Sequence, residues 1–90
     1  MSIGATMRGT ISRINPRRGM FAIQTDSGDF SVFENIGNEE FEIGDEVSWR
    51  NDTGMGSEQL TNHTKNRTCD VYFQNHWVSK SNLGNQLLET

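Results

Sequence analysis

The chain has 90 residues, of which 32% are hydrophobic and 22% are charged, and its net charge is −4. This length suits one small domain with a thin hydrophobic core. No apolar run approaches the roughly 18 residues of a membrane-spanning helix, so a membrane span is excluded. The first residues lack the apolar core of a signal peptide, and a cytoplasmic protein is expected.

The single cysteine, Cys69, cannot form a disulfide within one chain. A lone cysteine fits a reducing compartment, which agrees with a cytoplasmic location. The alternative is an oxidising compartment in which Cys69 pairs with a cysteine of another chain.

The charges are unevenly distributed along the chain. Residues 1–25 contain four arginines and no acid, whereas residues 26–58 contain ten acids and one arginine. A chain with net negative charge is repelled by phosphate at long range, so only a local basic patch would allow it to bind nucleic acid. The alternative for both segments is an ordinary solvated surface.

The first part of the chain predicts two β-strands joined by a turn. Residues 7–14 alternate apolar or small side chains with polar ones, the period-two pattern of a half-buried strand. Residues 15–19 contain a proline and a glycine and therefore predict a turn, which carries two arginines. In the second strand, residues 20–25, the alternation places Phe21 and Ile23 together on the inner face.

A third strand is predicted at residues 30–33, after a tight turn at residues 26–29. Its alternating pattern predicts that Phe30 and Val32 face the interior and that Phe33 faces outward. A register error of one residue would exchange the two faces of this strand.

Two further strands are predicted at residues 44–50 and 58–64, with a glycine-rich hairpin loop at residues 51–57 between them. Five short strands joined by turns favour an all-β fold, a small closed barrel, because closure removes exposed sheet edges. The barrel is expected to span residues 1–66. The predicted core consists of Ile11, Phe21, Ile23, Phe30, Val32, Val47, Trp49 and Leu60.

Residues 67–90 are predicted to form a C-terminal extension of one strand and one short helix. Residues 69–78 are rich in β-branched and aromatic side chains, which is typical of a strand. Its two faces would carry Val71, Phe73 and Trp77, and Tyr72, His76 and Val78, respectively. Ser81 is predicted to be the N-cap of the helix. We expect the extension to pack on the barrel or to form a homodimer interface.

No catalytic or metal-binding constellation is evident in the sequence. The spacing between His63, Cys69 and His76 matches no standard zinc pattern. No nucleophile, base and orienting group can be named together, so we expect no enzymatic activity, no catalytic residue, no metal and no cofactor. The three residues are interpreted as ordinary strand and turn residues.

Five segments follow one another in the order and spacing of a known family: RGTISRIN (8–15), RGMFAI (18–23), FSVFE (30–34), GDEVSW (44–49) and LTNH (60–63). With them the chain resembles the cold-shock domain family over about two thirds of its length. The resemblance implies a five-stranded OB-type barrel and single-stranded RNA or DNA as the partner. Such barrels stack bases on exposed aromatic side chains of the second and third strands, beside a basic groove.

The resemblance also implies which positions would contact nucleic acid, and there the chain departs from the family. Arg13 stands at the family's tryptophan position, and Met20 and Ala22 stand at two phenylalanine positions. At the three positions of the third strand where the family has exposed aromatic or histidine rings, this chain has only one aromatic residue, Phe33. Because each stacked base contributes about 1–3 kcal/mol, weak binding or altered specificity is expected.

The sequence therefore supports two hypotheses. The first is a cold-shock-like protein that binds single-stranded RNA or DNA through Arg13, Arg17, Arg18, Met20 and Phe33. The arginines would contact phosphate, and the other side chains, with Arg13, would form a reduced platform for bases. The second is a protein-interaction or assembly module on the same barrel that has lost nucleic-acid binding, which the acidic segment 26–58 and the missing aromatic side chains favour.

Overall fold

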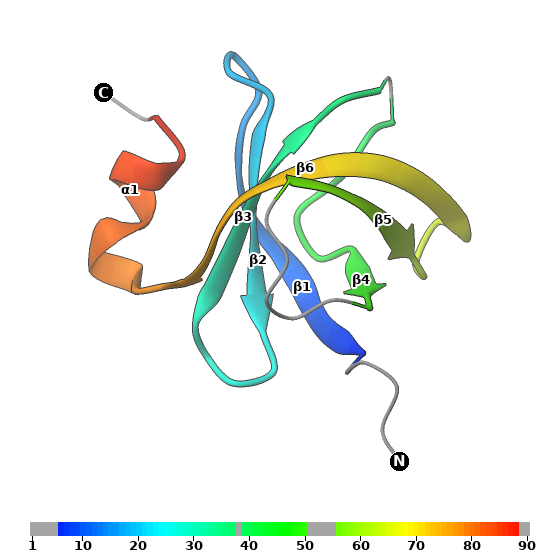
Figure 1. Ribbon diagram of the computed structural model, residues 1–90, viewed down its shortest axis with the longest axis horizontal. Coiled ribbons are helices and arrows are strands. Elements are labelled where there is room, and N and C mark those ends of the chain that lie inside the picture. The colour runs from blue at the N-terminus through cyan, green and yellow to red at the C-terminus, as the bar shows by residue number, and fades with distance from the viewer. Residues whose placement is uncertain (1–5, 38, 51–55, 89–90) are drawn as a thin grey trace.

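The computed structural model describes residues 6–37, 39–50 and 56–88. These residues form an antiparallel β-structure with a short helical segment near the C-terminus (Figure 1). The strands are β1 (Met7–Asn15), β2 (Met20–Thr25), β3 (Phe30–Asn35), β4 (Glu46–Trp49), β5 (Gly56–Asn62) and β6 (Arg67–Val78). The helical segment consists of the 3₁₀ turn η1 (Lys80–Asn82) and the helix α1 (Leu83–Gln86).

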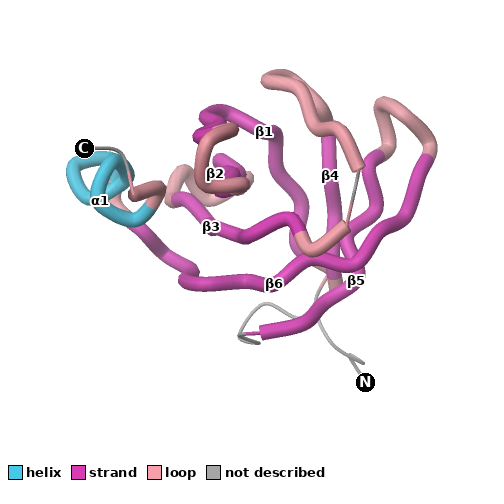
Figure 2. Tube along the Cα trace, turned by 90° about the horizontal axis from the view of Figure 1, so that it is seen from above, coloured by secondary structure: helices cyan, strands magenta, loops and turns pink. Residues whose placement is uncertain are grey.

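The strands close into a barrel in the order β1-β2-β3-β6-β5-β4, and β4 pairs with β1 to complete the ring. Two antiparallel meanders, β1 to β3 and β4 to β6, are joined along β3–β6 and along β1–β4. Figure 2 shows the strands from above, with the helical segment at one outer side of the barrel. The predicted all-β closed barrel is confirmed.

The predicted number of five strands is wrong, because β6 is part of the barrel wall. β6 pairs with β5 over Arg67–Phe73 and with β3 over Val71–Val78. With 12 residues, β6 is long enough to pair with both β3 and β5. Without β6 the facing edges of β3 and β5 would be unpaired, so a strand expected in the extension completes the ring.

The turns mostly lie where the glycines predict them, although the loop predicted at residues 51–57 falls largely outside the described residues. Gly28 adopts a φ of +94° in the β2–β3 turn, a conformation that other residues rarely adopt. Gly9 is needed for a different reason. A Cβ atom on Gly9 would lie 2.4 Å from the carbonyl oxygen of Gln24, so the close approach of β1 and β2 leaves no room for a side chain.

The barrel interior is a continuous apolar core with a cluster of phenylalanines at its centre. Phe21 and Phe33 are stacked with their ring centroids 5.1 Å apart, and Phe41 meets Phe21 edge-on at 5.2 Å. All eight residues predicted for the core are buried. The interior cluster consists of Ile11, Phe21, Ile23, Phe33, Phe41, Val47, Trp49, Leu60, Val71 and Phe73.

The prediction of which face of β3 points into the barrel is wrong, as expected from a shift of one residue in the alternation. Phe33 pairs with Phe21 across the sheet and is fully buried in the interior cluster, whereas Phe30 and Val32 point to the outer face. The FSVF pattern carries apolar residues on both faces, so its alternation does not discriminate between them. The pairing with β2 decides the orientation, because it brings Phe33 beside the inward-facing Phe21.

A second apolar cluster lies on the outer face of the barrel, under the helical segment. Leu83 and Leu87 are buried there against Met20, Ala22, Phe30, Val32 and Val78. Asn15 Nδ2 donates a hydrogen bond to the carbonyl oxygen of Leu87 at 2.8 Å, which ties the end of α1 to β1. The short helix is therefore confirmed, but Ser81 lies within η1 and is not its N-cap.

The predicted faces of β6 hold only as far as Asn75. The pairing with β3 shifts register between the contacts of Phe30 with Val78 and of Val32 with Asn75, and Trp77 has a φ of +54°. This irregularity turns His76 into the barrel, where it is 6% exposed, and leaves Trp77 60% exposed. The expectation that Trp77 shares a face with Val71 and Phe73 is wrong for this reason.

The connection between β3 and β4 is held on the barrel by the buried carboxylate of Asp45. Asp45 Oδ2 accepts hydrogen bonds from the Glu42 amide at 2.9 Å and from Asn62 Nδ2 at 2.8 Å, and Lys65 Nζ lies 3.1 Å away. Burial by itself raises the pKa of Asp45, but the hydrogen bonds and the lysine charge outweigh it. The pKa of Asp45 therefore lies below its ordinary value of 3.8.

We expect Asp45→Asn to lower the free energy of unfolding by about 1–3 kcal/mol at pH 7, because the substitution leaves Lys65 without its buried partner. A carboxyl group whose pKa falls on folding stabilises the protein above its unfolded-state pKa, and this contribution is lost as the pH falls through the folded-state pKa. Urea unfolding at pH 7 and at several pH values below 3.8 should show the wild type and the variant converging.

Glu46→Gln is the matched control for this experiment, since Glu46 is an exposed acid of the neighbouring strand. It should change stability by only a few tenths of a kcal/mol, roughly, at any pH. A gap between wild type and Asp45→Asn that stays constant through acid pH would contradict a role for the ionised carboxylate.

Candidate nucleic-acid interface

The turn between β1 and β2 presents two exposed arginines on a fixed backbone. The Arg18 amide donates a hydrogen bond to the carbonyl oxygen of Asn15 at 3.2 Å, and the Asn35 amide donates to Gly19 at 3.0 Å. These bonds anchor the turn to the ends of β1 and β3. Arg17 and Arg18 are exposed, and neither forms an ion pair with any residue that the structure describes.

The five predicted contact residues are not all on one surface. Arg13 is exposed on β1 and pairs in register with Ala22, so it faces outward beside the second apolar cluster. Met20 faces the same way but is only 4% exposed, because it is part of the cluster under the helical segment. Phe33 lies inside the barrel and is separated from the other four residues by the wall of strands.

The outer face of β2 and β3, where the resemblance places bases, is covered by the chain itself. Ala22 and Val32 are fully buried on this face, in contact with the cluster that contains Leu83 and Leu87. No exposed ring remains on it, since Phe30 is also buried. A strand of nucleic acid cannot reach this face unless the helical segment moves.

A depression lies beside the covered face and borders the basic turn. It is lined by side chains of the turn, of three strands and of the helical segment: Arg18, Met20, Glu34, Gln74, Asn85, Gln86 and Leu88. Of the predicted contact residues, Arg18 and Met20 therefore come together here. Gln74 Nε2 donates a hydrogen bond to Glu34 Oε1 at 3.2 Å across its floor.

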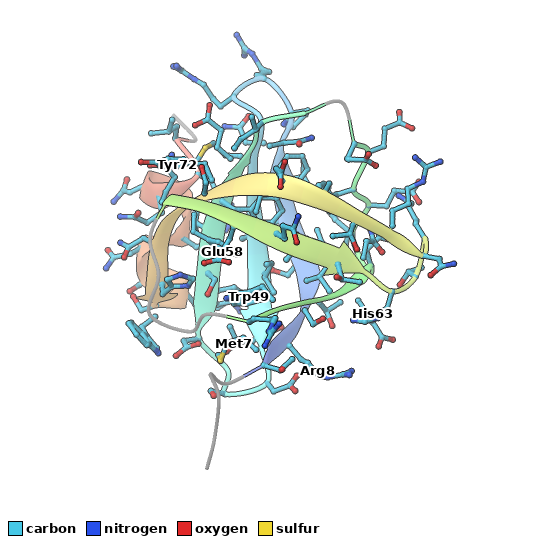
Figure 3. The ribbon with its side chains drawn as sticks, turned by 45° about the vertical axis from the view of Figure 1, so that its right-hand side comes forward. Met7, Arg8, Trp49, Glu58, His63 and Tyr72 are labelled. Atoms are coloured by element: carbon cyan, nitrogen blue, oxygen red, sulfur yellow. The ribbon has the colours of Figure 1, made fainter. Side chains whose placement is uncertain are left out.

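Two exposed aromatic side chains on β6 were not among the predicted contacts. Tyr72 is 44% exposed and pairs in register with Glu34, and Figure 3 shows it projecting from β6 near the start of β5. Simple alternation along β6 already separates Tyr72 from the buried Val71 and Phe73, so the sequence held a signal for it. The exposure of Trp77 depends on the irregular backbone and had no such signal.

The histidines take part in two serine–histidine pairs within the described residues. Ser31 Oγ lies 2.8 Å from His76 Nδ1, and Ser48 Oγ lies 2.7 Å from His63 Nε2. The first pair is buried, with the His76 ring 4.8 Å from the ring of Phe73, so it is closed to a substrate. This pair adds polar contacts to the barrel interior.

Cys69 is a half-buried free thiol on β6. Burial, together with the negative charges of Glu39 and Asp70, raises its pKa to about 11. The thiol is therefore protonated at neutral pH and a poor nucleophile. In the described residues no group of three or more histidine, cysteine or acidic side chains is arranged to hold a metal ion, and no described helix is long and apolar enough to cross a membrane.

Comparison with protein-family models, with curated proteins and with solved structures finds no match to this chain. The site therefore has to be interpreted from its own geometry, which combines an unpaired basic turn, a polar depression and an exposed tyrosine.

Proposed function

We propose that the protein binds single-stranded nucleic acid weakly, through the basic turn and the nearby outer surface of β6 instead of the face of β2 and β3. The observation that supports this most is the pair of exposed arginines, Arg17 and Arg18, without an ion-pair partner in the described residues. Unpaired arginines on an anchored turn contact phosphates with little loss of backbone freedom. The resemblance to the cold-shock family supports the same class of ligand.

In this proposal Tyr72 takes the role of the missing aromatic platform. Its side chain is 44% exposed and lies opposite Glu34, next to the depression that Arg18 also borders. A base stacked on one exposed ring contributes about 1–3 kcal/mol, so a single tyrosine with two arginines accounts for weak binding.

We expect Arg17→Ala to weaken the binding of oligo-U and oligo-dT and to reduce the slope of log affinity against log salt by about 0.7, because one phosphate contact is lost. Replacing Arg17 and Arg18 together should abolish detectable binding. Fluorescence anisotropy with labelled oligonucleotides at low salt measures both quantities.

Arg67→Ala is the matched control, because it removes the same charge from the start of β6, where Arg67 pairs with Glu39 at 3.6 Å. It should leave affinity nearly unchanged. The proposal is wrong if the wild type shows no binding at tens of micromolar protein, or if the Arg67 variant loses as much affinity as the Arg17 variant.

A second candidate function is protein interaction, and the exposure of Trp77 favours it. The Trp77 indole is 60% exposed, and Trp77 itself has a left-handed backbone conformation within β6. Exposed indoles of this kind serve as aromatic anchors at protein interfaces. Light scattering tests the simplest form, a homodimer. A dimer that Trp77→Ala dissociates would support this candidate, and a monomer at high concentration would remove the homodimer.

A further inference from the structure

We propose that the depression beside the basic turn is a subsite for one nucleobase and that guanine fits it best. The proposal rests on the proposed function when the base belongs to a strand of nucleic acid, but the same chemistry would take a free guanine nucleotide. It depends on which hydrogen-bonding groups around the depression are already used and which remain available.

The acceptor side of the depression is the carboxylate of Glu34. Its Oε1 accepts the hydrogen bond from Gln74 at 3.2 Å, and Oε2 has no partner among the described residues. Glu34 lies on an exposed position of β3, and no ion pair within 4.0 Å joins it to Arg18, although both line the depression. The carboxylate is thus held in place by one bond and offers free lone pairs to a ligand.

The donor side is formed by Arg18 and the amide of Gln86. Asn75 Nδ2 donates to Gln86 Oε1 at 3.3 Å, which orients this amide and leaves its NH₂ group free to donate. The guanidinium of Arg18 has no partner in the described residues. Met20 and Leu88 supply apolar surface to the same depression.

This arrangement is complementary to one base in particular. The edge of guanine offers two adjacent N–H donors and one carbonyl acceptor, which match a carboxylate beside arginine and amide donors. Uracil and thymine offer one N–H between two carbonyl oxygens, so a carboxylate gains one hydrogen bond and faces two repelling oxygens. Cytosine and adenine offer a single amino group beside an acceptor nitrogen. A good bidentate contact discriminates by about 1–3 kcal/mol, or roughly 5- to 150-fold.

The depression also explains how a negatively charged side chain can belong to a nucleic-acid site. Glu34 would repel a phosphate placed beside it, as any carboxylate does. With the phosphate on Arg17 and the base edge on Glu34 and Arg18, the carboxylate meets N–H donors and no phosphate oxygen. Glu34 is then the residue that selects the base.

The test compares a labelled oligo-U containing one central guanosine with the same oligo-U lacking it, and in a second arm compares GMP with UMP. We expect the guanosine-containing strand to bind about tenfold more tightly to the wild type. Glu34→Gln should remove this preference while all-U binding stays the same or rises, because the variant lacks the repelling charge. Glu46→Gln, an exposed acid on β4, is the matched control and should keep the preference.

The outcomes test the guanine subsite separately from the proposed binding of nucleic acid. Equal affinity for the two strands, or a preference that Glu34→Gln retains, overturns the guanine site even if Arg17→Ala still weakens binding. If no oligonucleotide binds, the proposed function fails, and the comparison of GMP with UMP decides whether the guanine subsite exists. Binding of GMP but not UMP that Glu34→Gln abolishes would support the subsite, and no binding of GMP would overturn it.

Discussion

Phe33→Ala is expected to lower the free energy of unfolding by about 3–5 kcal/mol, because it removes a fully buried ring from the centre of the barrel. Phe33 stacks on Phe21 at 5.1 Å and meets Phe41 and Phe73 edge-on at 5.3 and 5.8 Å, so three rings would border the cavity. Urea unfolding monitored by circular dichroism measures this change. Since small domains are only marginally stable, the variant is expected to be partly unfolded at room temperature.

This experiment also decides between the two orientations of β3. An outward Phe33 available to stack on bases would be replaced at a loss of well under 1 kcal/mol, roughly the effect of a surface substitution. Ile43→Ala provides that comparison, because Ile43 is 68% exposed. If the two variants are equally stable, Phe33 does not lie in the interior and the outward orientation expected from the sequence is restored.

Leu87→Ala is expected to lower the free energy of unfolding by about 2–4 kcal/mol, because Leu87 is fully buried against the outer face of the barrel. The same substitution loosens α1 over Met20 and Val32, so it should raise the exposure of the outer face of β2 and β3. Thermal unfolding measures the stability, and amide hydrogen exchange of β2 measures the loss of cover.

Leu88→Ala is a neighbouring control with the same change in volume. Leu88 is 47% exposed, so its truncation should change stability by less than about 1 kcal/mol. If the two leucine variants are equally stable, or if β2 is no less protected in Leu87→Ala than in the wild type, the helical segment does not stabilise the barrel. The second apolar cluster would then contribute little to the fold.

The sequence predicted the barrel well because its first elements have unambiguous signals. The proline and glycine of residues 15–19 mark a turn, and Phe21 and Ile23 alternate with smaller or more flexible side chains. The third strand was harder, since Phe30, Val32 and Phe33 place apolar groups on both faces. Here burial does not follow from alternation, because one face packs in the barrel and the other packs under the helical segment.

The candidate site was predicted in part, and the missing part depends on distant residues. Arg17 and Arg18 follow directly from a polar turn, which leaves long charged side chains in solvent. Met20 was expected on an open surface but is covered by Leu83 and Leu87, which come from the other end of the chain. Glu34 and Gln74 meet because β3 pairs with β6, a contact that no local pattern in either segment indicates.

Local sequence patterns were enough to predict a small closed β-barrel and a turn between its first two strands that carries exposed arginines. Local propensity, alternation and turn chemistry suffice for these features, since each depends on residues close together in the chain. The tertiary structure decided that β6 closes the ring, that Phe33 faces inward and that the helical segment covers the outer face of β2 and β3. Those outcomes depend on which apolar faces meet in space, and a pattern with two apolar faces allows more than one answer until its neighbours are in place.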